Sequence, residues 1–461
     1  MNIVLFNRDL RIFDHQPLGE AAKMGEILPL YILEPSEWEE DTHSIRHFQF
    51  VVESLEELSE QIENLGGKLF FSINKLEEVL EKLLEAYESI NIFVHRNSFL
   101  LEKILEWSEH NQQRVFIYGP DFGSVTAKLF KQLFQEHVKE PLVEKPAKIY
   151  IPKETPSVLF TDIKKIKKFR VKGKRIRFGQ QGGESRATET LDSFLEERFA
   201  NYVGNQHKPL PSSFSSSRLS AYISWGNISV RTVFQKTTEA LETCDSTEER
   251  HQLETFLSKL IARVKSSSMI PENNESVELS KIKNGWNEEW FERWLEGRTG
   301  FPIIDAAMRS LDKTGWLNFT LREMVTSFIT NTLLMDGQKP GTALAQLYLD
   351  YEPALHSFYF RHISGLTAKV KIINPLRVGK QIDPEGAFIR RYISELENIP
   401  IEYIHEPWLY PGFYQLGYPT PMIDVVKANK SARQKFKSLT QETKPARKNT
   451  EGETEQLSFD L

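Results

Sequence analysis

The first 135 residues alternate short apolar runs with longer segments in which apolar residues recur every three or four positions. The longer segments 45–65 and 76–87 predict amphipathic helices. The short runs have the length of buried strands, and strands that alternate with helices form parallel sheets. The pattern therefore predicts a Rossmann-like α/β domain over residues 1–135, with strands at 2–6, 27–33, 68–72, 90–95 and 115–118.

The pattern changes after residue 135. Residues 136–195 predict a basic interdomain linker, and 196–445 predict an all-helical domain because apolar residues keep a helical period there. The final segment 446–461 is polar and predicts a disordered tail. The clearest helical segments are expected at 188–199, 230–241, 249–264, 302–313 and 321–334.

The linker contains an unusual run of charge. Residues 164–177 read KKIKKFRVKGKRIR, with nine basic residues in fourteen. A run of this kind is typical of a solvated linker. It is also typical of a strip that meets the phosphates of a polyanion. The sequence leaves both interpretations open.

Composition narrows the classes of protein. The net charge of -6 excludes a polycation that coats nucleic acid over its whole surface. Cys244 is the only cysteine, which excludes intrachain disulfides, multi-cysteine zinc sites and cysteine-ligated iron–sulfur clusters; we predict no metal site. The N-terminus lacks the basic start and long apolar run of a secretory signal, and no segment has the roughly 20 apolar residues that span a bilayer. We expect a cytoplasmic protein with no membrane partner.

No GxGxxG follows the first predicted strand, so the sheet is not predicted to bind a dinucleotide in the Rossmann manner. Three other blocks occur in a fixed order along the chain: FNRDLRIFDHQPL at 6–18, SSRLSAYISWGNIS at 216–229, and a long block at 297–391. The long block contains GRTGFP, DAAMR, TGW, NP and DPEG. These blocks resemble the photolyase/cryptochrome family, outside its iron–sulfur branch.

The resemblance implies a blue-light flavoprotein with FAD in its helical half. Serines before a helix offer hydroxyls and amides to phosphate oxygens, so Ser216, Ser217 and Ser220 are expected at the FAD diphosphate. In the family, an arginine and an acid pair beside the isoalloxazine and a second acid binds polar edges of the cofactor. The expected cofactor-binding residues are Tyr202, Ser216, Ser217, Arg218, Leu219, Ser220, Arg322, Asp350, Glu352 and His356.

The chain departs from the family at the positions that face a DNA lesion. Lys259 and Ala262 stand where photolyases carry a glutamate and a tryptophan, and Phe319 stands at a common asparagine with Asn318 next to it. His356 aligns with the residue that faces flavin N5. There it donates a hydrogen bond, supplies a proton or only fills space. We predict His356 and Trp316 as the catalytic residues.

The positions that supply electrons and an antenna also differ. Phe360 and Gly337 replace two members of the family's tryptophan chain, and the third lies near Trp286. Tyr359, Trp316 and Trp290 are candidate substitutes. Residues 94–99 read VHRNSF, without the acidic ligand expected for an antenna chromophore, so we do not predict a pterin antenna.

The sequence leaves two functions open. The first is DNA repair by a lyase of the deoxyribodipyrimidine photo-lyase type, acting as a monomer on flipped pyrimidine dimers in damaged DNA. Basic residues near the expected cavity favour this DNA-binding function, and they are Arg361, Lys369, Lys371, Arg377 and Lys380. The second is a cryptochrome-like photoreceptor or redox flavoprotein without repair activity, which the substitutions at Lys259, Ala262 and His356 favour.

Overall fold

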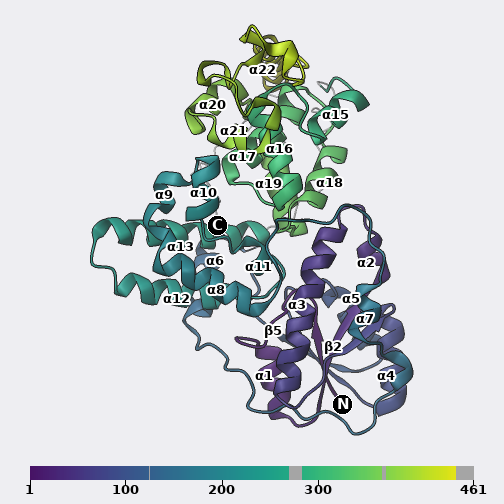
Figure 1. Cartoon of the computed structure of the whole chain (residues 1–461). Helices are drawn as coiled ribbons and strands as arrows, with labels where there is room; N and C mark the ends of the chain where they lie inside the picture. The colour runs from purple at the N-terminus through teal and green to yellow at the C-terminus, as the bar shows by residue number, and fades with distance from the viewer. Residues whose placement is uncertain (124, 269–282, 366–369, 443–461) are drawn as a thin grey trace.

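The computed structural model describes residues 1–123, 125–268, 283–365 and 370–442. Figure 1 shows an α/β half at the bottom and a larger helical half above it. The predicted tail 446–461 and Lys369 lie outside the described residues. The predicted boundaries between the domains remain predictions.

The α/β half is built on a parallel sheet with strand order β3-β2-β1-β4-β5. The strands are β1 (Asn2–Phe6), β2 (Ile27–Leu33), β3 (Phe70–Ile73), β4 (Asn91–His95) and β5 (Arg114–Tyr118). The inner strands β1 and β2 are buried along their whole length, which explains their continuous apolar runs. Their helices are α1 (Gln16–Lys23), α2 (Pro35–Glu39), α3 (Ile45–Asn64), α4 (Leu76–Tyr87) and α5 (Leu101–His110). The predicted fold class is confirmed.

The linker and the helical half follow α6 (Ala127–Lys139), which packs against α12 (Val230–Glu242) through Phe134 and Phe234. Between α6 and α8 (Glu184–Glu196), the linker contains a short 3-10 turn at Ser157–Leu159 and α7 (Ile163–Lys167). The first helices of the helical half are α8 (Glu184–Glu196), α10 (Pro209–Ser215), α11 (Ser220–Ser224), α12 (Val230–Glu242) and α13 (Thr247–Ser267). The later helices are α15 (Glu288–Leu295), α16 (Pro302–Thr314), α17 (Phe319–Ser327), α18 (Gln338–Leu347), α19 (Pro353–Ile363), α20 (Pro375–Ile382), α21 (Ala387–Tyr392) and α22 (Val425–Glu442).

Two predicted helices differ from the structure. The helix expected at 321–334 ends at Ser327 and continues as a π-helical segment, Phe328–Thr332. Asn331 in that segment donates to the carbonyls of Ile363 and Lys371, contacts that periodicity does not encode. The helix expected at 188–199 begins earlier, at Glu184, because its polar first turn carries no apolar signal.

The sequence block 297–391, which carries most of the family resemblance, begins with a turn around a buried carboxylate. The buried carboxylate of Asp305 accepts from the amides of Thr299 (2.7 Å) and Gly300 (3.0 Å) and from the hydroxyl of Tyr418. Gly300 has a φ of +82°, and a Cβ there would lie 2.4 Å from the Thr420 carbonyl oxygen. The GRTGFP sequence therefore shapes the backbone around Asp305 and lies outside the site described below.

One segment joins the two halves, and we call residues 346–351 the clasp. Its six consecutive carbonyl oxygens each accept a side-chain hydrogen bond. The donors to Gln346, Leu347 and Tyr348 are Ser44 (2.8 Å), Arg46 (3.1 Å) and His47 (2.8 Å). The donors to Leu349, Asp350 and Tyr351 are Trp225 (2.9 Å), Ser224 (3.0 Å) and Arg8 (2.8 Å). Four of these donors come from the α/β half and two from α11 and its C-terminal end.

The clasp holds His47 in its neutral form. Its Nε2–H donates to Tyr348, while its Nδ1 accepts from the Ser44 amide (3.2 Å), so both ring nitrogens are used by the neutral tautomer. Burial lowers the pKa of His47 to about 3. In the unfolded chain this histidine takes up a proton near pH 6.5, so the folded state loses stability as the pH falls below that value.

Replacing His47 with Gln should reduce the pH dependence of stability. Wild-type protein is expected to lose about 2 kcal/mol through this residue between pH 7.5 and pH 5. The glutamine keeps a donor for the Tyr348 carbonyl but takes up no proton. The measurement is denaturant unfolding at both pH values, with His251→Gln on the exposed face of α13 as the control. An equal loss in wild type and His47→Gln would contradict the assignment.

None of the helices among the described residues combines the length and the apolar character that crossing a bilayer requires.

Candidate functional site

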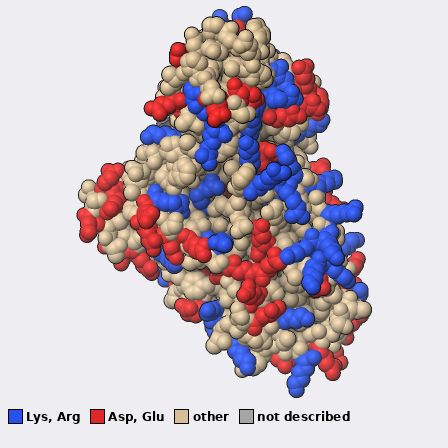
Figure 2. All heavy atoms as spheres, in the orientation of Figure 1, with Lys and Arg blue, Asp and Glu red and all other residues tan. Residues whose placement is uncertain are grey.

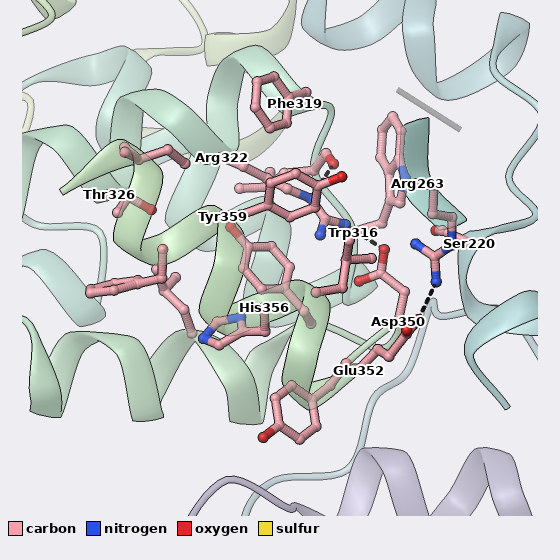
Figure 3. Close-up of a pocket in the computed structure, with 17 residues that line it drawn as sticks. Ser220, Arg263, Trp316, Phe319, Arg322, Thr326, Asp350, Glu352, His356 and Tyr359 are labelled. Carbon is pink, nitrogen blue, oxygen red and sulfur yellow. Dashed lines mark hydrogen bonds and ion pairs between the residues drawn. The ribbon is translucent and has the colours of Figure 1, made fainter. Parts of the chain in front are cut away.

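A cavity lies in the helical half, where α17 and α19 meet the end of the clasp (Figure 3). It brings predicted site residues together with apolar and aromatic side chains. Leu317, Leu344, Leu355 and Ile363 provide apolar walls. The predicted residues in the cavity are Ser220, Trp316, Arg322, Asp350, Glu352 and His356.

Arg322 and Asp350 form the central ion pair of the cavity. Nη2 of Arg322 lies 2.7 Å from Oδ2 of Asp350, and Nε donates to the Leu317 carbonyl (3.0 Å). The guanidinium also lies 4.1 Å from the centroid of the Tyr348 ring. Burial alone raises the pKa of Asp350, but the charge and hydrogen bond of Arg322 lower it below its ordinary value. The pair therefore presents a fixed negative oxygen and a fixed cation to the cavity.

A second ion pair lies beside the first, and sequence reasoning missed its arginine. Nη2 of Arg263 on α13 contacts Oε2 of Glu352 (2.8 Å) and the Ser224 hydroxyl (2.7 Å). Figure 3 shows Arg263 and Glu352 next to Asp350. Arg263 lies one helical turn after Lys259, so the spacing placed both on one face of α13. The four-residue spacing from Lys259 was therefore the sequence feature that could have identified Arg263 as a site residue.

His356 on α19 is fixed by one hydrogen bond. Its Nε2 lies 3.0 Å from the Gly341 carbonyl oxygen, which accepts only, so Nε2 carries the proton and Nδ1 is the acceptor. Burial lowers the pKa of His356 to about 4. Its ring meets Tyr351 edge to face, with centroids 5.5 Å apart. At neutral pH this side chain therefore offers the cavity a lone pair and no positive charge.

The predicted serine cluster is divided by the structure. Ser220 lines the cavity, whereas Ser216 and Ser217 occupy the turn between α10 and α11. The Ser217 hydroxyl accepts from the Leu219 amide at 3.4 Å, which is local turn chemistry. The Ser216 hydroxyl is buried without a hydrogen-bond partner among the described residues. An orphaned buried hydroxyl at this turn fits a binding site for a polar ligand.

The remaining predicted residues, Tyr202, Arg218 and Leu219, are not part of the cavity lining. Arg218 stacks its guanidinium 4.1 Å from the Trp316 ring, and burial lowers its pKa to about 10. Leu219 is buried in the apolar core. Tyr202 is buried under Lys259, whose ammonium lies 4.6 Å from the ring centroid. Lys259 also donates to the Gln206 side chain. These residues support the site but do not line it.

Some of the aromatic residues considered as electron donors line the cavity, and others do not. Trp316, Tyr359 and Phe360 line the cavity, and Phe319 pairs edge to face with Tyr359 at 5.6 Å. A Cβ on Gly337 would lie 2.8 Å from the Phe360 ring, so the glycine leaves room for that phenylalanine. Trp286 is partly exposed and lies away from the cavity lining.

A second cleft lies between the halves, at the sequence where an antenna ligand was considered. His95, Asn97 and Phe99 line it. Behind them, Asp9 lies within hydrogen-bond distance of His15 (3.0 Å) and His95 (2.7 Å), a group of the size that holds a metal ion. However, Nδ1 of His15 accepts from the Leu18 amide, so its Nε2 carries the proton and donates to Asp9. This geometry describes a hydrogen-bond network rather than a set of metal ligands.

The fold and the cavity define a class: an α/β domain joined to a helical domain whose cavity is lined by aromatic side chains and two arginine–carboxylate pairs. Comparisons with known proteins agree. Residues 2–103 match the DNA photolyase family model, and residues 251–438 match the FAD binding domain of DNA photolyase.

Relatives match over nearly the whole chain. A deoxyribodipyrimidine photo-lyase of Alkalihalophilus pseudofirmus is 27% identical, covering 96% of this chain and 99% of the relative. Cryptochrome-1 of Aedes aegypti is 25% identical, and the match covers 95% of this chain and 93% of the relative. A class III photolyase structure from Agrobacterium tumefaciens superposes with a TM-score of 0.79 at 23% identity, covering 95% and 98%, which shows a shared fold. The chain belongs to the photolyase/cryptochrome family of blue-light flavoproteins, and its cofactor is FAD.

Proposed function

We propose that this chain repairs pyrimidine dimers in DNA, using light and reduced FAD held in the cavity of the helical half. The observation that carries the proposal is the composition of that cavity. Two ion pairs lie in it together with the aromatic pair Phe319 and Tyr359, whose ring faces suit flipped pyrimidine bases. Arg377 lies exposed after α19 and supplies a cation for phosphates, whereas the exposed Lys371 and Lys380 contact Glu323 and Glu406.

The cavity residues fit FAD by their chemistry. The isoalloxazine edge has both N–H donors and carbonyl acceptors, and buried groups of both kinds need partners. Asp350 offers the acceptor and Arg322 the donor, at a separation that their ion pair fixes. Ser220 and the orphaned Ser216 hydroxyl are proposed to bind the diphosphate, with Arg263 and Glu352 nearer the polar edges of the nucleotide.

When bound in this cavity, reduced FAD would supply the light-driven electron transfer that repair requires. The side chains of the protein hold and orient the cofactor and the flipped bases, and they keep water out of the cavity. The apolar side chains around the ion pairs exclude water and strengthen their electrostatic effect. His356 remains neutral and presents Nδ1 as an acceptor, which favours the role of a fixed hydrogen-bond partner over that of a proton source.

One observation favours a photoreceptor without repair activity as the second candidate. Lys259 stands where photolyases carry a lesion-facing glutamate, and its ammonium is occupied by Gln206 and the Tyr202 ring. A buried lysine in that arrangement is a poor replacement for a carboxylate that contacts a base.

Blue light on reduced protein with dimer-containing DNA separates the two candidates. Repair predicts that dimers disappear catalytically, with several turnovers per FAD, and that none are split in the dark. Dimer content is measured by chromatography after nuclease digestion. Persistent dimers, in protein whose oxidised flavin band near ~450 nm is bleached by blue light in a separate sample, would favour the photoreceptor.

Arg322→Ala should purify with little FAD. The mutation removes one partner of a buried ion pair and leaves Asp350 without its counter-charge. We expect FAD affinity to fall by about tenfold or more, measured by titration of the apoprotein and by the flavin absorbance of purified protein. Arg298→Ala, which breaks an exposed ion pair with Glu296, is the control. A fully loaded, stably folded Arg322→Ala protein would exclude the proposed role.

His356→Asn tests the neutral histidine. Because its pKa is about 4, His356 does not change charge between pH 5.5 and 8. The rate of blue-light bleaching of the bound flavin should therefore have the same pH profile in wild type and His356→Asn, whatever the absolute rates. An inflection near pH 6.5 that only the wild type shows would identify His356 as a proton source.

A further inference from the structure

The linker carries a concentrated positive charge on a chain that is otherwise acidic. We call residues 164–177 the basic strip. It holds nine of the 58 Lys and Arg residues and none of the 64 Asp and Glu residues, while the chain as a whole has a net charge of -6. The strip is therefore a local concentration of positive charge on a chain of negative net charge.

The basic strip is attached to the body of the protein. Ile166 is fully buried and Ile176 is 8% exposed, so its apolar side chains point inward. The Lys172 carbonyl accepts from the Ile45 amide at 2.7 Å, and the Phe178 amide donates to the Lys313 carbonyl at 3.3 Å. The strip follows the surface of α3 and reaches α16, in a fixed course.

All nine cations of the strip are exposed. Three contact acids: Lys167 with Glu56, Lys172 with Asp41 at 3.7 Å, and Lys174 with Asp312 at 2.7 Å. Within the described residues, no ion pair is formed by the other six, which are Lys164, Lys165, Lys168, Arg170, Arg175 and Arg177. Figure 2 shows Lys and Arg gathered at the right-hand edge, where the linker crosses in Figure 1.

We propose that the basic strip binds the phosphate backbone of duplex DNA without regard to sequence. This goes beyond the proposed repair, because it requires no lesion, no FAD and no light. From Lys168 to Arg177 an extended chain spans at most about 30 Å. Each strand of a duplex carries one phosphate about every 3.4 Å along the axis, so four or more contacts fit along the strip.

The shape of the strip favours DNA over an anionic membrane. Membrane-surface segments insert an apolar face, usually from an amphipathic helix. Here the apolar side chains of the strip are turned into the protein, and α7 is only five residues long. Exposed cations on an extended, fixed backbone match a line of phosphates.

The test measures binding of an undamaged fluorescent duplex of about 20 base pairs in the dark, by anisotropy at several salt concentrations. The strip variant is Lys168→Gln, Arg170→Gln, Arg175→Gln and Arg177→Gln. The control variant neutralises four exposed lysines of α4 and α6: Lys82→Gln, Lys128→Gln, Lys131→Gln and Lys139→Gln. Thermal unfolding and FAD content check that each variant is folded.

The expected result is a loss of affinity of about tenfold or more for the strip variant. The slope of log affinity against log salt should fall by about 0.9 for each phosphate that the variant no longer neutralises. The control variant should keep the wild-type slope. Unchanged binding by the strip variant, or an equal loss in the control, would overturn the proposal. Tighter strip-dependent binding to phosphatidylserine vesicles or to duplex RNA would overturn the choice of DNA. Dimer repair does not enter this readout, so its failure would leave the strip's result standing.

Discussion

The clasp connects six successive carbonyl oxygens to side chains from both halves of the protein, and the rest of the site depends on it. The last carbonyls of a helix have no partners within the helix, and the clasp begins at the end of α18. Ser44, Arg46 and His47 satisfy them from the α/β half. Because the backbone is held on both sides, the Asp350 carboxylate has a fixed position before any cofactor arrives.

This constraint explains how the α/β half shapes a cavity that lies in the helical half. Arg8 is buried between the rings of Phe99 and Trp225, at 4.5 and 4.1 Å from their centroids, and donates to the carbonyl of Tyr351. The opening RDLR block of the chain thus reaches the lining of the cavity through one buried arginine. Removing water from this junction strengthens each of these bonds, and it also keeps His47 neutral.

Much of the fold followed from the sequence, because its signals are local. Strands β1 and β2 appear at the predicted residues, and β3 lies two residues later than the first predicted position. The sequence predicted some residues of the site and missed others. Arg322, Asp350 and Glu352 line one cavity and their role toward FAD stays a prediction, whereas the Ser217 hydroxyl accepts a hydrogen bond within its own turn. Arg263 and the clasp were missed, because both depend on contacts between residues distant in sequence, which no local period records.

The Arg322–Asp350 pair is proposed to hold one FAD in the helical half. The most direct measurement is a titration of wild-type apoprotein with FAD, followed by quenching of flavin fluorescence, with the stoichiometry read from the end point. One FAD bound tightly per chain is the predicted result. Folded apoprotein that takes up no FAD would contradict the account.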